Sequence, residues 1–550
     1  MSNQARDISQ PAGAGLAQIL TPEHPFGFQA TESMFEFGKD NTDLLFDRRN
    51  LVYRQAVHES RPTYIVGRKG AGKTAFLASS QFLGSARIEE LQTGNVYREI
   101  LTVLGTYEQR YGRPFVDETA KIWMALFDEI AMFHAHRTAI QSDSPQQLQA
   151  LSDYFSTLPV GAGPTDVVSW FLHALQGRIA EHSGLTAAID GLVCGGVRLV
   201  DARSAMHSLL SGRAQPLIIV MDNLEDLAMR LYELHDVLAG LFRCTGRVVS
   251  GHGDDRPFGI QMCLPSEIFD RIHEIPTAPE KDLQGSYLKI FWNARELLRL
   301  AGGRLHLFLR MHHPDQLELL ERKSALLDES DEPIALLRAA LPARMTSGLD
   351  IDEDPLAYVL RHTQLLPRHL IGILNGVFSR KDKGSRPWAV APSAVLAGTR
   401  HAEQLLVAGV LKAYGSSYPT AAEVLRRLSG RLSISFPASQ LHEVYVRAGI
   451  RKLAQLSFNE FLSMLFDLGV VGIKFGETDR YNKAHFQYTF DNSLVPREEL
   501  DHLCLHPLFT RYLLERSIPR LREERSHATY PYGCDPLGDD YRHMLGYFDN

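Results

Sequence analysis

The sequence predicts an α/β fold with a mainly parallel sheet, followed by a helical region and a C-terminal domain of helices and one hairpin. Three observations indicate this order. From residue 51 to about 300, short apolar runs alternate with longer helical patterns, which is typical of parallel strands joined by helices. From 301 to 395 the apolar residues follow a helical period. In the remainder, helical segments precede two strand-like runs, 470–475 and 484–490, with a polar turn between them.

These patterns divide the chain into five predicted regions. The N-terminal stretch is rich in Ala, Gly, Pro and Gln without periodicity, so we expect it to be flexible. Helices followed by one hairpin predict a winged helix. The predicted regions are a flexible arm at 1–34, an α/β core at 35–300 with a long helical insertion at about 80–210, a helical region at 301–395, a winged-helix domain at 396–515 and a polar tail at 516–550.

The composition excludes several classes of protein. The 550 residues are 44% hydrophobic and 22% charged, which is ordinary for globular domains. No apolar run approaches the roughly 20 residues that span a bilayer, and the N-terminus lacks a signal-peptide pattern, so we expect a cytoplasmic protein without a membrane partner. The five widely spaced cysteines indicate neither a disulfide framework nor a zinc site. A net charge of −7 argues against a protein that coats nucleic acid, but it leaves room for a local basic face.

A phosphate-binding motif opens the predicted core. Residues 67–74 read G-x-x-x-x-G-K-T, between an apolar run typical of a buried strand and a helical pattern. Glycines allow positive-φ turns, so successive N–H groups can point inward at an anion at the start of a helix. The motif is a P-loop. The residues expected to hold the nucleotide are Gly67, Gly70, Ala71, Gly72, Lys73, Thr74 and Ala75, with positive φ expected at the three glycines.

The motif also predicts the chemistry of the ligand. Lys73 is expected to contact the β and γ phosphates, and the Thr74 hydroxyl is expected to ligate Mg²⁺, which prefers hard oxygen ligands. The only segment similar to the guanine-reading N-K-x-D motif, residues 482–485, lacks its aspartate, which favours ATP over GTP. We therefore expect ATP and Mg²⁺ as the ligands.

Three carboxylates near residue 222 are candidates for metal binding and catalysis. The apolar run 217–221 ends at Asp222, which can hold the hydration shell of Mg²⁺ beside the phosphates. The alternative role for Asp222 is a helix N-cap. Glu225 is the first choice for orienting or deprotonating the attacking water, and Asp226 is the second. Either acid can instead stabilise the N-terminus of a helix through its dipole.

The segment 222–226 is similar to the D-G-L-D-E-like sequence that follows the Walker B strand in the STAND and AAA-type branch of P-loop ATPases. The resemblance covers roughly residues 35–510 and makes the helical region at 301–395 a lid. It implies that Ser266, which follows the apolar run 258–264, acts as sensor 1.

Two arginines complete this resemblance. Residues 365–368 are similar to the G-x-P-R signature of sensor 2, with Leu365 in place of the glycine. Arg368 would then contact the γ-phosphate and couple nucleotide state to the lid; its alternative role is that of a surface arginine after a proline turn. Arg271 lies in the region expected for an arginine finger that acts on a neighbouring subunit.

The C-terminal part resembles the winged-helix domains of origin-recognition-like and related bacterial ATPases, through residues 462–471 and 506–509. Such a domain contacts DNA or mediates protein contacts. Basic residues lie on or near this domain, where they can meet phosphates or simply face solvent: Arg426, Arg427, Arg431, Arg447, Arg451, Lys452, Lys474, Arg480 and Lys483.

Two functions follow from these observations. The preferred one is an ATP-binding, ATP-hydrolysing switch that couples nucleotide state to homo-oligomerisation or to binding of an effector or sensor protein. The family resemblance extends this role to anti-phage defence or stress responses. The alternative is a DNA-binding ATPase of the replication-initiator or transposition-helper type. A small-molecule kinase is a third class, which the lid and winged-helix material disfavours.

Overall fold

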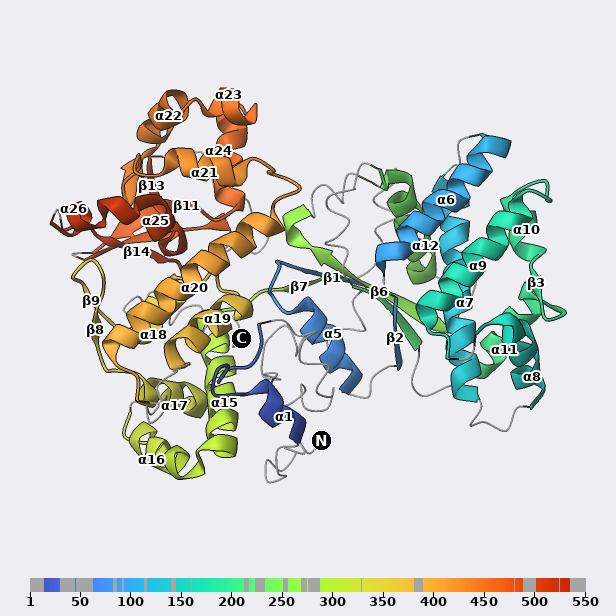
Figure 1. Ribbon diagram of the computed structural model, residues 1–550, viewed down its shortest axis with the longest axis horizontal. Helices are drawn as coiled ribbons and strands as arrows, with labels where there is room; N and C mark the ends of the chain where they lie inside the picture. Colours follow the sequence, from blue (N-terminus) through green and yellow to red (C-terminus); the bar gives the residue numbers. More distant parts are fainter. Residues whose placement is uncertain are drawn as a thin grey trace. The chain divides into compact units, whose positions relative to one another are not determined.

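The protein is described from a computed structural model, which divides into two compact units (Figure 1). The first unit comprises Met1–Asn50, Lys69–Gly72 and Phe291–Asn550, and the second comprises Leu51–Arg68 and Lys73–Ile290. The structure describes residues 14–29, 45, 63–82, 87–91, 93–112, 116–139, 145–159, 161–211, 217–222, 233–250, 256–268, 275, 287–327, 329–379, 389–478, 480–487, 501–523 and 525–534.

A five-stranded parallel sheet organises the second unit. Its order is β2-β5-β6-β1-β7, and every neighbouring pair is parallel. The strands are β1 (Tyr64–Gly67), β2 (Arg87–Leu91), β5 (Leu217–Met221), β6 (Phe258–Pro265) and β7 (Tyr287–Ile290). The sheet confirms the predicted α/β class with parallel strands.

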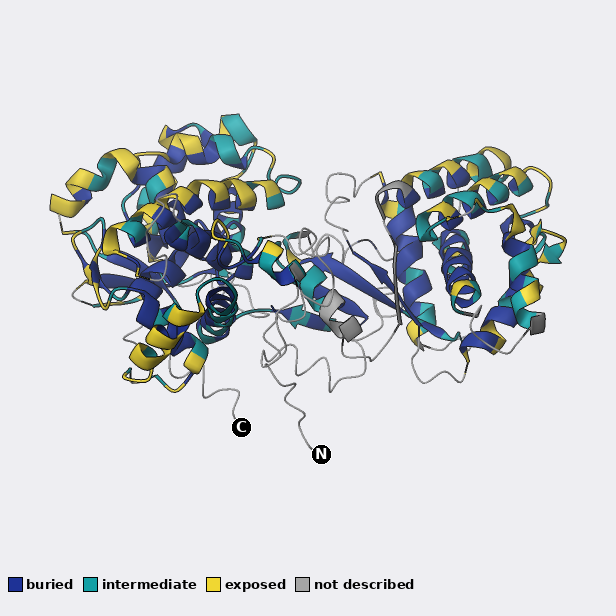
Figure 2. Cartoon of the chain, turned by 60° about the horizontal axis from the view of Figure 1, so that its bottom comes forward, coloured by how far each residue is buried: buried dark blue, intermediate teal, exposed yellow. Residues whose placement is uncertain are grey.

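The register brings the ends of the P-loop strand and of β5 to one edge of the sheet. Strand β6 lies between them, and its Met262 is opposite both Tyr64 in β1 and Met221 in β5. The carboxyl ends of parallel strands share an edge, so the loop after β1 and Asp222 after β5 leave the sheet on the same side. Strands β1 and β5 are buried along their whole length, in keeping with the buried sheet in Figure 2. Their residues are apolar, and parallel sheets are usually covered on both faces.

Helices account for most of the described chain between β1 and β7. These elements are α5 (Lys73–Phe82), α6 (Thr93–Tyr111), α7 (Val116–Ala139), α8 (Pro145–Tyr154), η1 (Phe155–Thr157), α9 (Pro164–Ile179), α10 (Leu185–Asp190), β3 (Val193–Cys194), β4 (Val197–Arg198), α11 (Leu199–Leu210), α12 (His235–Ser250) and η3 (Ser266–Ile268). Helix α7 packs closely on α12 (Figure 1). The buried Trp123 donates its indole N–H to the carbonyl of Val237 at 2.9 Å, and a Cβ built on Gly240 would stand 2.5 Å from Thr119. This glycine therefore permits the close approach of the two helices.

Helices also dominate the first part of the first unit. They are α1 (Ala14–Ile19), α15 (Ala294–His312), α16 (Pro314–Ser324), α17 (Glu332–Ala340), α18 (Pro355–Arg361), α19 (Pro367–Phe378) and α20 (Pro392–Ala413), with the short strands β8 (Met345–Thr346) and β9 (Asp352–Glu353) between α17 and α18. Asn293 caps α15, and its side chain accepts from the Glu296 N–H at 2.8 Å.

Residues 14–29 differ from the flexible arm predicted at 1–34. Leu16, Ile19, Leu20 and Phe26 are fully buried in the core of the first unit. The first three lie at helical spacing on α1 and its end, so they form an apolar face. The Ala- and Gly-rich composition obscured this short pattern in the sequence.

The C-terminal part of the first unit contains a second five-stranded sheet, of order β10-β13-β11-β12-β14. Its strands are β10 (Ser435–Pro437), β11 (Val471–Glu477), β12 (Tyr481–His485), β13 (His502–Leu505) and β14 (Ala528–Pro531), and the helical elements are α21 (Ala421–Leu428), α22 (Ala438–Arg447), α23 (Ile450–Ala454), α24 (Phe458–Asp467), α25 (Pro507–Leu514), η6 (Glu515–Ser517) and α26 (Ile518–Glu523).

The predicted hairpin corresponds to β11 and β12, which pair antiparallel, but its second strand, predicted at 484–490, begins earlier, as β12 at Tyr481–His485. It belongs to a larger sheet, because β12 also pairs in parallel with β14, a strand inside the predicted polar tail. Ala528 and Tyr530 of β14 are buried against Tyr481, which explains why this part of the tail is ordered in a strand. A winged helix stays a prediction.

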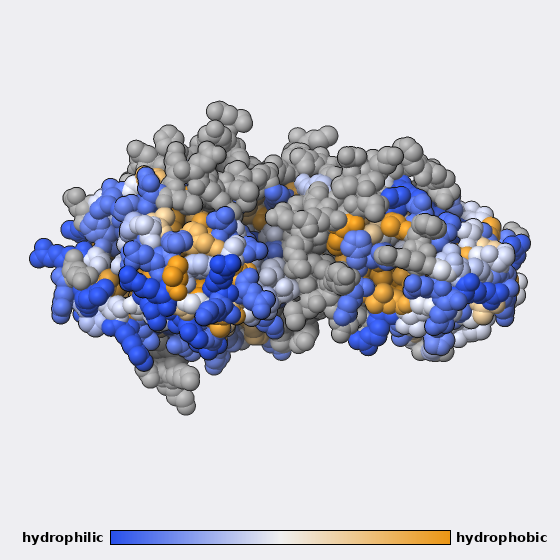
Figure 3. Space-filling view, turned by 90° about the horizontal axis from the view of Figure 1, so that it is seen from above, coloured by the Kyte–Doolittle hydropathy of each residue, from blue (hydrophilic) through white to orange (hydrophobic). Residues whose placement is uncertain are grey.

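Large apolar side chains are exposed on both units among the described residues. Figure 3 shows a largely hydrophilic surface that also carries patches of apolar residues. The most exposed apolar side chains are those of Val193, Val200, Val249, Leu319, Leu326, Leu405, Val446, Phe475 and Tyr512. None of the helices that the structure describes is long and apolar enough to cross a membrane.

Candidate functional site

The P-loop motif forms a glycine-rich turn between β1 and α5. Gly70 and Gly72 have φ angles of +89° and +97°, the region that favours glycine. Gly67 does not fit the predicted positive φ, because it is the last residue of β1 and is paired with Pro265 and Ile290 in the neighbouring strands. Two glycines therefore shape the turn, and the third ends the strand.

Lys73 is the first residue of α5, and its side chain folds back along the loop. Its exposed fraction is only 6%. The ammonium Nζ donates to the carbonyl of Gly67 at 3.0 Å and to that of Arg68 at 3.4 Å. The positive charge is thus held at the turn, at the N-terminus of α5. The lysine charge and the helix dipole both favour an anion there.

Thr74 and Asp222 meet although 148 residues separate them. The Thr74 hydroxyl donates to Asp222 Oδ2 at 2.7 Å. Asp222 is buried, and Thr74 is half-buried. Two hard oxygen atoms therefore lie side by side where the loop meets the end of β5, and oxygen atoms of this kind are the ones that Mg²⁺ prefers. No group of three His, Cys, Asp or Glu that could hold a metal by itself occurs in the described part of the chain.

The structure describes some of the remaining predicted site residues and not others. Glu225, Asp226 and Arg271 lie outside the described residues. Ser266 is exposed and begins η3 directly after β6, the strand between β1 and β5. Ala75 is half-buried in α5.

Within the first unit, Arg368 lies against the tip of the P-loop. Its backbone N–H donates to the carbonyl of Gly70 at 3.5 Å. A Cβ built on Gly70 would stand 2.9 Å from Arg368 Cβ, closer than side chains tolerate, so only glycine permits this approach. Arg368 is the second residue of α19, and Leu365 before it has a φ of +51°. Leu365 thus adopts the left-handed conformation at the position where the G-x-P-R signature has glycine.

Two further residues near the loop tip were not predicted as site residues. Trp292 donates its indole N–H to the carbonyl of Ala71 at 2.8 Å, and Ala71 itself is buried. The carbonyl of Gln29 accepts from Arg368 Nε at 3.4 Å. The place of Trp292 just after β7 could have indicated its role, but nothing in the sequence marked Gln29.

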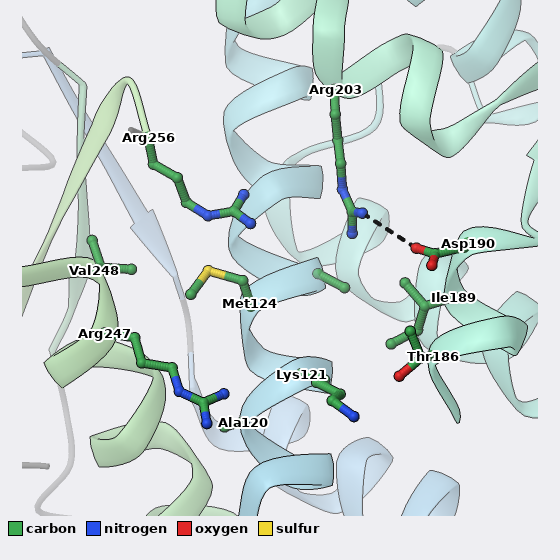
Figure 4. Close-up of a pocket in the computed structure, with 11 residues that line it drawn as sticks. Ala120, Lys121, Met124, Thr186, Ile189, Asp190, Arg203, Arg247, Val248 and Arg256 are labelled. Carbon is green, nitrogen blue, oxygen red and sulfur yellow. Dashed lines mark ion pairs between the residues drawn. The ribbon is translucent and has the colours of Figure 1, made fainter. Parts of the chain in front are cut away.

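A concave feature lies within the helical part of the second unit. It is a pocket of about 340 Å³. Figure 4 shows the guanidinium groups of Arg203 and Arg256 pointing toward its middle from different elements. Its lining residues are Ala120, Lys121, Met124, Ala125, Thr186, Ile189, Asp190, Arg203, Arg247, Val248 and Arg256.

The cations of this pocket all have carboxylate partners. The fully buried Asp128 pairs with Arg203 at 2.9 Å and also with Arg256. Arg203 lies 3.8 Å from Asp190. Further pairs are Arg247 with Asp117 at 2.6 Å and Lys121 with Glu118 at 3.1 Å. The ion pairs join α7 to α11, to α12 and to the start of β6, so the cluster stabilises the packing of these elements, and we assign no ligand to it.

Several basic residues considered for DNA contact are also ion-paired. Arg426 and Arg427 lie 2.5 and 3.6 Å from Glu423. Arg447 lies 3.2 Å from Glu443, and Lys474 pairs with Glu477. Exposed pairs of this kind contribute roughly 0–1 kcal/mol and break easily, so they neither form nor exclude a phosphate-binding face.

No protein-family model and no curated protein matches this sequence. Among solved structures, a Walker-type ATPase of Pyrococcus abyssi is similar with a TM-score of 0.34 and 11% identity, over 79% of this chain and 91% of that protein. The ORC2 protein of Aeropyrum pernix, solved in ADPNP–ADP complexes, is similar with a TM-score of 0.31 and 12% identity, over 84% of this chain and 87% of that one. At these values the similarity assigns no role to any residue of this chain.

Proposed function

We propose that the protein binds ATP with Mg²⁺ and hydrolyses it slowly or upon stimulation by a partner. One observation carries the proposal: the hydrogen bond between Thr74 and Asp222, which joins a glycine-rich strand–turn–helix to the end of a neighbouring parallel strand. Hydroxyl and carboxylate oxygens at this point suit a magnesium ion beside phosphates.

The proposed roles of the site residues follow from their places. Lys73 neutralises the β and γ phosphates, because its ammonium is already held at the turn. Thr74 and Asp222 hold the ion and its water shell. Glu225, or else Asp226, orients the attacking water, and Ser266 contacts the nucleotide from the end of β6.

We further propose that nucleotide state sets the position of Arg368 and thereby controls assembly or partner binding. The contact of Arg368 with the loop tip at Gly70 supports this role, because a guanidinium close to the loop can exchange local partners for a phosphate. The output is oligomerisation or binding of an effector or sensor protein, in a defence or stress response. A switch of this type requires an output with different affinity for the two nucleotide states.

The test is ATP binding and phosphate release by wild-type protein and by Lys73→Ala, with Lys121→Ala as the control for loss of a lysine charge outside the loop. We expect Lys73→Ala to lose both signals and Lys121→Ala to keep them. Unchanged ATP binding by Lys73→Ala would refute the proposal. Hydrolysis and assembly are measured in the same samples, so binding without turnover identifies a switch that needs its partner.

Duplex DNA added to these assays tests the alternative of a DNA-binding ATPase. Binding whose affinity falls with salt, and whose salt dependence decreases by about one unit per lost contact in Arg426→Ala or Arg480→Ala, would favour it. Absence of a salt-dependent signal would eliminate it.

A further inference from the structure

Residues 20–29, called the N-terminal strap, run from the end of α1 to Gln29 and are anchored on α15 and α19. The Phe26 N–H donates to Asn375 Oδ1 at 3.0 Å, and Asn375 Nδ2 donates to the carbonyl of Gly27 at 2.8 Å. A single buried amide on α19 therefore holds two consecutive residues of the strap.

Further contacts from α15 hold the other side of the strap. Arg304 Nη1 donates to the carbonyl of Phe26 at 2.8 Å, and His312 Nε2 lies 2.7 Å from the carbonyl of Leu20. Burial lowers the pKa of Arg304 to about 10, so the side chain stays cationic at neutral pH and donates a charge-assisted hydrogen bond. The Phe26 ring also meets Phe378 edge-on at 5.0 Å.

The strap ends beside Arg368. The Gln29 carbonyl accepts from Arg368 Nε at 3.4 Å, and a Cβ built on Gly372 would stand 2.8 Å from Gln29 Nε2. Arg368, Gly372 and Asn375 are four and three residues apart, so they share one face of α19. The strap therefore lies along the helix face that begins with Arg368.

Arg368 thus connects the strap to the loop tip. On one side its guanidinium donates to the strap, and on the other its backbone N–H and Cβ contact Gly70. The Gln29 carbonyl restricts the rotamers of a long side chain that would otherwise lose considerable entropy on binding an anion. Restricting a side chain in advance increases its affinity for a ligand, because less entropy is lost on binding.

From this geometry we propose that the N-terminal strap positions Arg368 for the γ-phosphate, so that changes in the strap alter the protein's preference for ATP over ADP. The inference rests on the proposed function, because it needs a nucleotide at the P-loop. It assigns the N-terminal segment a regulatory role. A partner that displaces the strap would weaken the contact between Arg368 and the γ-phosphate, and so the preference for ATP.

The test compares the ratio of the ADP and ATP dissociation constants, each measured with Mg²⁺, in two strap variants. Gly27→Ala strains the strap, because Gly27 has a φ of +78° and its Cβ would stand 3.3 Å from Ile19. Gly372→Ala displaces only the Gln29 side chain and favours the helix. Gly303→Ala is the matched control, since α15 has open space at that glycine.

We expect Arg368→Ala to reduce the preference for ATP about ten-fold, within the usual range of coupling between sites. The strap variants should reduce it in the same direction, Gly27→Ala more than Gly372→Ala, and the control should not. Combined with Arg368→Ala, neither strap variant should reduce the ratio further, because a positioning residue acts only through the group that it positions.

Two outcomes would overturn the inference. One is an unchanged ratio in folded Gly27→Ala and Gly372→Ala, with folding checked by thermal unfolding. The other is an equal effect of these variants with and without Arg368. Both are distinct from failure of the proposed function, in which wild-type protein itself shows no ATP binding that depends on Lys73.

Discussion

Thr74 and Asp222 form a hydrogen bond of 2.7 Å between the first turn of α5 and the end of β5. The bond fixes the positions of these two oxygen atoms relative to each other. A divalent ion that bound there would take a lone pair of the hydroxyl oxygen, while the hydroxyl proton could stay directed at Asp222, so the backbone would not need to reorganise. The geometry therefore makes separate predictions for the hydroxyl and for the methyl group of Thr74.

Thr74→Ser should retain Mg²⁺-dependent ATP binding, because it keeps the hydroxyl. Thr74→Ala should reduce the Mg²⁺-dependent part of the affinity about ten-fold or more, which corresponds to the loss of one interaction with a charged group, roughly 1.5–3 kcal/mol. Titrations of ATP with and without Mg²⁺ measure this part directly. Equal affinities for the two variants in Mg²⁺ would show that the hydroxyl is no ligand.

Gly70→Ala should weaken both the loop and its contact with Arg368. The substitution places a Cβ 2.9 Å from that of Arg368 and imposes a φ of +89° on alanine, a conformation that costs about 1–2 kcal/mol in residues other than glycine. Nucleotide affinity and thermal stability should both fall. Gly105→Ala on α6, where a Cβ meets open space, is the control and should preserve both.

The α/β class with parallel strands and the P-loop motif could be predicted from the sequence, because both depend on local patterns. Fixed glycine spacing, apolar strand runs and a carboxylate after a strand all lie within ten residues. The sequence could not reveal that β6 separates β1 from β5, because pairing between distant strands leaves no local pattern. The sequence also could not show that Gly67 belongs to the strand. Its place there follows from its pairing with Pro265 and Ile290, which the motif alone does not indicate.

The N-terminal strap and β14 were missed for a different reason. Each contributes few buried side chains, and those chains are stabilised by tertiary contacts and not by periodicity. Phe26 is fully buried beside Phe378, and Tyr530 is buried where it donates to Glu353, yet both lie in stretches of unremarkable composition. Local composition describes the average tendency of a segment, whereas burial of one aromatic side chain can decide its structure.

The left-handed conformation of Leu365 should carry a measurable cost. Leu365 and Leu366 are both buried, with exposed fractions of 6% and 5%, but only Leu365 has a positive φ. Replacing either by glycine loses a similar apolar contact, while Leu365→Gly also relieves strain of about 1–2 kcal/mol. Thermal unfolding should therefore show Leu365→Gly to be less destabilising than Leu366→Gly. The reverse order would mean that the turn is unstrained.

Asp128→Asn should strongly destabilise the helices around the pocket. The carboxylate is fully buried between Arg203 and Arg256, and removing one partner of a buried ion pair costs about 3–5 kcal/mol because the remaining charges lose their compensation. Asp190→Asn is the matched control, since Asp190 is half exposed and lies 3.8 Å from Arg203. Amide hydrogen exchange in α7 should accelerate in the first variant and stay near wild type in the second.

The stability of the second unit should depend on pH through Glu129. This carboxyl is completely buried next to Tyr154, whose hydroxyl donates to it at 2.6 Å, and burial raises its pKa from 4.5 to about 8. The folded protein therefore retains a proton that the unfolded chain releases above pH 4.5. The resulting stability is fully present below about pH 4.5 and is lost as the pH rises toward 8, by on the order of 4 kcal/mol.

Glu129→Gln cannot release a proton, so its advantage over wild type in unfolding free energy should grow between pH 5 and pH 8. Glu108→Gln, the same chemical change at an exposed position of α6, provides the baseline in the same denaturation series. A constant difference between Glu129→Gln and wild type across this range would contradict a protonated Glu129 in the folded protein.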